Sequence, residues 1–172
     1  MNATAASQNR YLNLFSDRAF RRVFGSERDK GITLSLLNAL LENTERITDF
    51  QLVSTAYIPD NPADRGIVLD LQCLTADGRR IVVELQKRQQ TFFRERTLFY
   101  STWPIQSQGK PFDLEKNAKA NWDYNFKAVY VVSLLDFALD KHSADTRIVS
   151  RKMIRDVETN ETWTDRLVFV NV

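Results

Sequence analysis

Residues 67–87, IVLDLQCLTADGRRIVVELQK, decide the fold of this chain. Two runs rich in β-branched and other apolar residues flank an Ala-Asp-Gly turn signal, which predicts a β-hairpin. A three-residue loop over residues 76–78, with Gly78 in the left-handed conformation and a bulge beside it, suits this turn. A two-residue loop centred on Asp77 and Gly78 would mix polar and apolar side chains on both faces. The three-residue loop is therefore the expected one.

The three-residue loop sets a register in which Asp70 lies directly opposite Glu84. One face of the hairpin is then wholly apolar, and the other carries both acids together with Gln72 and Gln86. A clean division of this kind predicts that the apolar face packs on the core. The expected apolar face consists of Leu69, Leu71, Cys73, Ile81, Val83 and Leu85.

Placing Asp70 beside Glu84 costs stability. Opposed side chains on one face have Cβ atoms about 4.5–5.5 Å apart. At an effective dielectric constant of about 20, two unit charges at that distance repel by roughly 3 kcal/mol. A shared proton, a basic neighbour or a bound cation would offset this cost, and we favour a divalent metal ion.

The composition predicts one folded domain without a membrane span. A chain of 172 residues with 43% hydrophobic residues can bury a sizeable core. Residues 1–15 are expected to form a flexible polar tail, and residues 16–172 a single domain. The formal charge of +2 is too small to indicate nucleic-acid binding by itself. No apolar run reaches the roughly 20 residues that cross a bilayer, so a cytoplasmic protein is expected.

The rest of the chain predicts helices packed on a mixed sheet. Ser16 and Gly25 mark the start and end of a first helix. The other expected elements are a helix over 32–43, a strand over 47–58, a helix over 91–103 stopped by Pro104, a strand over 127–139 and a closing hairpin over 147–172. This order of elements indicates an α/β or α+β domain with a mixed central sheet flanked by helices.

Three polar side chains on the hairpin predict metal chemistry. Asp70 and Glu84 supply hard oxygen anions, and Gln86 lies on the same face with an amide that can coordinate or orient water. Mg²⁺ prefers one or two carboxylates and keeps several waters. An ion held in this way can polarise a phosphodiester and activate water near neutral pH.

Five segments carry a resemblance that spans nearly the whole chain. They are SDRAFRRVFG at 16–25, VLDLQ at 68–72, VVELQ at 82–86, FFRERTLFYSTW at 92–103 and VYVVSLLDF at 129–137. With these segments in this order, the chain resembles the PD-(D/E)XK nuclease superfamily, and within it the recombination-promoting nuclease (Rpn) family.

The resemblance implies a metal-dependent DNA endonuclease with a restriction-endonuclease-like core. Asp70 and Glu84 would be ligands of Mg²⁺ or Mn²⁺, DNA would be the partner, and a C-terminal region beyond residue 172 would follow. The oligomeric state stays open, a homodimer included. Leu69 stands where the superfamily has proline, and Gln86 stands where it has lysine. Glutamine carries no charge and is no general base, although Glu-x-Gln is common in the Rpn family.

The helix expected over 91–103 brings an arginine near the site. Arg96 projects from the middle of an aromatic face, whereas Arg94 lies on the opposite face. The aromatic face consists of Phe92, Phe99, Tyr100 and Trp103. An arginine on such a face needs a partner, so Arg96 pairs with Glu84 or with a scissile phosphate, or else it extends its head into water.

Two further assignments stay open. Asp17 is either a third acid of the site or a first-turn residue favoured by the helix dipole. Arg88, Arg94 and Arg96 form the basic stretch nearest the site and are candidate DNA contacts. The alternative to an endonuclease is a catalytically inactive nuclease-fold module that binds DNA or a protein partner.

Overall fold

The computed structural model describes residues 13–42, 45–59, 61–109, 123–139 and 146–172. Most of the expected tail over residues 1–15 lies outside these ranges, so its flexibility is not described. Residues 110–122, the middle of a polar stretch for which the sequence predicts no helix or strand, also lie outside the described ranges. No helix in the described ranges is long and apolar enough to cross a membrane.

Both N-terminal helices form where the sequence predicts them. Helix α1 spans Asp17–Phe24, and α2 spans Gly31–Leu40. The side chain of Ser16 accepts a hydrogen bond from the Ala19 amide, which satisfies a donor at the start of α1. Both helices bury apolar residues against one face of the sheet.

Six strands form the central sheet in the order β1-β4-β5-β6-β8-β7. Their bounds are β1 Phe50–Leu52, β4 Leu71–Thr75, β5 Arg80–Gln86, β6 Val129–Leu135, β7 Ser150–Arg155 and β8 Thr162–Asn171. The pairs β5/β6 and β6/β8 are parallel, and the other neighbours are antiparallel. The mixed sheet with flanking helices confirms the predicted α/β (α+β) class.

The prediction of a single strand over 47–58 is wrong. The structure divides it into β1 and a separate strand β2, Ala56–Tyr57, which pairs with β3, Ile67–Val68, in a small second sheet. The closing hairpin is confirmed as β7 and β8, with Asn160 in the left-handed conformation at its turn.

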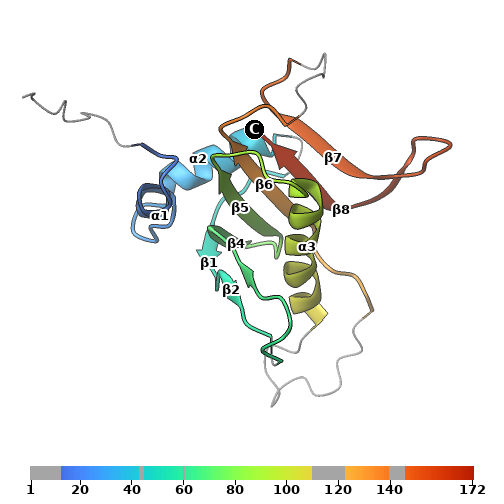
Figure 1. Ribbon diagram of the computed structural model, residues 1–172, viewed down its shortest axis with the longest axis horizontal. Coiled ribbons are helices and arrows are strands. Elements are labelled where there is room, and N and C mark those ends of the chain that lie inside the picture. Colours follow the sequence, from blue (N-terminus) through green and yellow to red (C-terminus); the bar gives the residue numbers. More distant parts are fainter. Residues whose placement is uncertain (1–12, 43–44, 60, 110–122, 140–145) are drawn as a thin grey trace, which may run out of the picture.

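Three layers result, and β5 and β6 lie at their centre (Figure 1). Helices α1 and α2 cover one face of the sheet, whereas α3, Phe93–Gln106, crosses the other face. Buried residues of β6 alternate between the two cores: Val132 packs on the α1/α2 side and Val131 on the α3 side. The prediction that this strand is buried on both faces is therefore confirmed.

The predicted hairpin register is confirmed. Leu71 pairs with Val83 and Cys73 with Ile81, while Gly78 has a φ of 88°. One member of the predicted apolar face is misplaced, because Leu69 packs with Val82 on the α3 side. The backbone leaves the β4 ladder at Asp70, so the strict alternation of side chains ends there.

The end and the buried face of the third helix differ from the prediction. Helix α3 continues through Pro104 and ends two residues later at Gln106, and Pro104 has no N–H to donate to the Tyr100 carbonyl. Phe92 precedes the helix with a φ of 61° and is 72% exposed. The buried residues of α3 are Phe93, Thr97, Ser101 and Pro104. Tyr100 and Trp103 flank this stripe and pack beside Val82.

Candidate active site

Asp70 and Glu84 are joined by hydrogen bonds that replace one step of the β4–β5 ladder. The Asp70 amide donates to Glu84 Oε1 at 3.2 Å. The Leu85 amide donates to Asp70 Oδ2 at 2.8 Å. Each carboxylate therefore binds the backbone of the other acid's segment, and both acidic groups are held at one end of the hairpin.

The environment of Glu84 favours its neutral form. Glu84 lies on the central strand β5, and the residue is only 5% exposed. Burial, followed by the charge of Asp70, raises the pKa of Glu84 to about 8. The Asp70 amide, Arg96 and Arg21 act in the opposite direction but do not cancel this effect. The two arginines therefore do not supply enough positive charge to keep Glu84 ionised beside Asp70.

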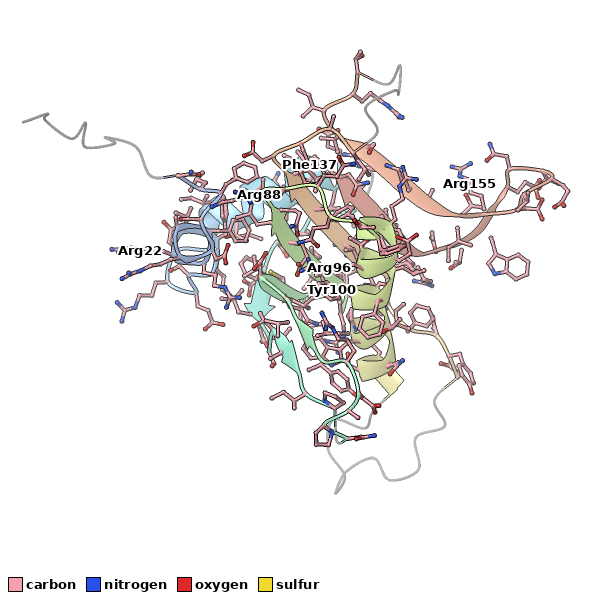
Figure 2. The ribbon with its side chains drawn as sticks, viewed as in Figure 1. Arg22, Arg88, Arg96, Tyr100, Phe137 and Arg155 are labelled. Atoms are coloured by element: carbon pink, nitrogen blue, oxygen red, sulfur yellow. The ribbon has the colours of Figure 1, made fainter. Side chains whose placement is uncertain are left out.

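Arg96 approaches this pair from α3, as one of the sequence-based alternatives predicts. Its Nη2 lies 3.7 Å from Glu84 Oε2. Its Nε donates to the Tyr100 hydroxyl at 2.9 Å, and the guanidinium carbon lies 4.9 Å from the centre of that ring (Figure 2). Nη1 donates to Gln90 and, at 3.5 Å, to Gln86. These contacts aim the guanidinium at the acids.

Gln86 faces the same site from the end of β5. Its Oε1 accepts the bond from Arg96, while its Nε2 donates to the Arg88 carbonyl at 3.4 Å. Gln86 is half-buried, so its amide can still reach a bound molecule. The expected grouping of Asp70, Glu84, Gln86 and Arg96 is thus present in the fold.

Arg21 is a site residue that sequence reasoning missed. It extends from α1, where its Nη2 donates to the Leu69 carbonyl at 3.2 Å and lies 3.9 Å from Asp70 Oδ1. No local pattern links Arg21 to a segment 48 residues further along the chain. The contact becomes visible only when α1 packs on the sheet. The one sequence signal is that Arg21 directly follows Phe20, which is buried in that packing.

The other predicted residues lie around this group. Asp17 is exposed in the first turn of α1, four residues before Arg21 and so on the same side of the helix. Arg88 and Arg94 are exposed, one after β5 and one on α3. The role of Asp17 as a third acid, and of these arginines as DNA contacts, stays a prediction.

The donor set fits a hard divalent cation that keeps most of its waters. Among the described residues, no group of three or more His, Cys, Asp or Glu side chains is arranged to hold a metal. Two carboxylates and a neighbouring amide are nevertheless the kind of set that Mg²⁺ uses together with water or phosphate oxygens. A cation held there would also offset the repulsion between Asp70 and Glu84.

A family model described as PD-(D/E)XK nuclease family transposase matches residues 14–172. The chain belongs to this family. Comparison with curated proteins and with solved structures gave no match. The PD-(D/E)XK assignment agrees with the mixed sheet, and it indicates a nuclease-like or transposase-like function.

The PD-(D/E)XK match also gives the site its context. Nucleases of this family generally use divalent metals, and DNA is the substrate that a nuclease family implies. That Asp70, Glu84 and Gln86 occupy the motif positions of the family stays a prediction from the sequence. Two arginines, Arg21 and Arg96, lie within 4 Å of the two acids.

Proposed function

We propose that this chain is a divalent-metal-dependent endonuclease that hydrolyses DNA phosphodiester bonds. The observation that supports it best is the Asp70–Glu84 pair, two acids locked together with Glu84 buried. Repulsion between the two acids would cost a purely structural pair stability, whereas a bound cation would offset that cost. Membership of the PD-(D/E)XK family supports the same activity.

Asp70 and Glu84 would hold the cation, Mg²⁺ or Mn²⁺. When bound there, the ion would polarise the scissile phosphate and make water a better nucleophile. The hydrogen bond from the Leu85 amide orients Asp70, and the bond from the Asp70 amide orients Glu84. Both carboxylates are therefore already aimed before anything binds, which lowers the entropic cost of binding.

Arg21 and Arg96 would stabilise the phosphate. In the present structure each lies within 4 Å of one of the acids. Once those acids hold a cation, the same guanidinium groups can bind phosphate oxygens, where planar forks give two parallel hydrogen bonds. Charge that develops on the phosphate in the transition state is then met by donors already in position.

Gln86 would orient the attacking water. Its Oε1 accepts from Arg96 and can accept a bond from water in the same way. Glutamine does not take up a proton, so its contribution is one of geometry. Arg88 and Arg94 would contact the DNA backbone on either side of the scissile bond, as their exposure allows.

Cleavage of circular and linear DNA in Mg²⁺ or Mn²⁺ tests this proposal. Asp70→Asn and Glu84→Gln should each abolish cleavage while the protein stays folded, whereas Glu95→Gln on the exposed side of α3 should retain it. Full activity of either site variant would refute the assigned roles. A wild-type protein that binds DNA in a salt-sensitive way, without cleaving it in either metal, would favour the non-catalytic module.

A further inference from the structure

Polar side chains form a row across the parallel strands at the level of Glu84. In the register of the sheet Glu84 pairs with Ser133 of β6, and Ser133 pairs with Asn171 of β8. All three project to the α3 side, because Val82, Val131 and Phe169, two residues earlier on each strand, pack on that side. Ser133 is therefore the nearest β6 side chain to Glu84.

The hydroxyl of Ser133 is buried and makes no hydrogen bond among the described residues. Ser133 is 1% exposed. Ser101 on α3 is equally buried, but its Oγ donates to the Leu98 carbonyl at 2.6 Å. Buried hydroxyls without a partner are uncommon in folded proteins. An apolar residue like the preceding Val131 and Val132 would fill this position without that cost.

We propose that Ser133 is a positioning residue that donates a hydrogen bond to the Glu84 carboxylate when a divalent cation is bound. This inference rests on the function proposed above. A hydroxyl can rotate about its Cβ–Oγ bond and donate to a neighbouring carboxylate. Residues paired on adjacent strands project from backbones about 4.8 Å apart, so a rotation of the hydroxyl directs it toward the Glu84 carboxylate.

A bond from Ser133 would complete the orientation of the Glu84 carboxylate. Its Oε1 accepts from the Asp70 amide at 3.2 Å, whereas its Oε2 lies 3.7 Å from Arg96 Nη2, beyond hydrogen-bond distance. Hydrogen bonds to ligating carboxylates fix their orientation, and removal of such a bond typically weakens metal binding by about 10–100-fold.

Three variants of the full chain test the proposal: Ser133→Ala, Ser133→Thr and the matched control Ser101→Ala. Mn²⁺ binding is measured by calorimetry, and thermal unfolding is measured in a chelator. Ser133→Ala should weaken Mn²⁺ binding about tenfold or more without lowering the midpoint of metal-free unfolding. Ser133→Thr, which keeps the hydroxyl, should retain most of the affinity. Ser101→Ala should lower the unfolding midpoint and keep the affinity.

The outcomes test the role of Ser133 separately from the existence of the metal site. If Ser133→Ala binds Mn²⁺ like the wild type while Asp70→Asn does not bind it, the role of Ser133 is refuted and the metal site stands. If the wild type binds no Mn²⁺, both proposals are refuted. Should Ser133→Ala fail to fold, Ser133→Cys replaces it, because a thiol is a weak donor of similar size, and unchanged affinity again refutes the role.

Discussion

Asp70 and Glu84 hold each other in place: the Asp70 amide donates to the Glu84 carboxylate, and the Asp70 carboxylate accepts from the amide that follows Glu84. Hydrogen bonds from backbone amides to these two side chains thus extend the β4–β5 pairing by one residue pair beyond Leu71 and Val83. This arrangement fixes two acids side by side. Its electrostatics and its neighbours lead to four predictions.

The first prediction concerns the pH dependence of stability. Burial and the charge of Asp70 raise the pKa of Glu84 from 4.5 to about 8, so the folded state binds a proton that the unfolded state releases. The stabilisation is fully present below pH 4.5 and disappears as the pH rises to 8. At most it amounts to about 5 kcal/mol.

Glu84→Gln, which cannot ionise, should therefore exceed the wild type in stability by a margin that grows between pH 5 and pH 8.5. Chemical denaturation in a chelator at several pH values measures this margin. Glu95→Gln on the exposed surface of α3 is the control and should run parallel to the wild type. Parallel curves for Glu84→Gln as well would contradict the assignment of a neutral Glu84.

The second prediction concerns metal binding. We expect saturable binding of Mg²⁺ or Mn²⁺ to the wild type by calorimetry, because Asp70 and Glu84 present converging oxygens. Asp70→Asn should abolish this binding, since an amide oxygen offers no charge to a hard cation. Asp64→Asn, in an exposed loop, makes the same chemical change away from the site and should bind like the wild type. Equally weak binding by both variants would point to an effect unrelated to the pair.

The third prediction separates two neighbouring arginines of α1. Arg21 lies 3.9 Å from Asp70, whereas Arg22 extends from the outer side of α1 (Figure 2). Arg21→Ala should lower kcat for DNA cleavage by about 10²–10³-fold, the usual effect of removing one donor that stabilises a transition state. Arg22→Ala should change kcat by less than about threefold. A similar decrease in the two variants would mean that α1 contributes only general positive charge.

The fourth prediction concerns DNA affinity. Removing the side chain that neutralises one phosphate should reduce the slope of log K against log salt by about 0.9. Arg88→Ala is expected to weaken DNA binding and to reduce the slope by this amount. Arg155→Ala, at the end of β7 on the projecting hairpin, is the matched control and should keep the wild-type slope (Figure 2). Equal slopes for the wild type and Arg88→Ala would remove Arg88 from the DNA-binding surface.

Errors in the sequence-based assignment arise where a local period is broken by a distant contact. Leu69 fits the alternation of the hairpin, but the bend at Asp70 turns it to the other face. Phe92 fits the helical period of the aromatic face, but α3 begins one residue later and buries Phe93 instead. In both cases the residue lies just outside the strand or helix to which the sequence assigns it, so the local period does not predict the face that it presents.

The sequence by itself determined the hairpin register, the pairing of Asp70 with Glu84 and the α/β class. These follow from side-chain alternation and turn chemistry, which act between residues close together in the chain. Only the tertiary structure decided that Arg21 joins the site from α1 and that Ser133 lies beside Glu84. Those neighbours are brought in by packing and by parallel strand pairing across long separations, which no local period in the sequence encodes.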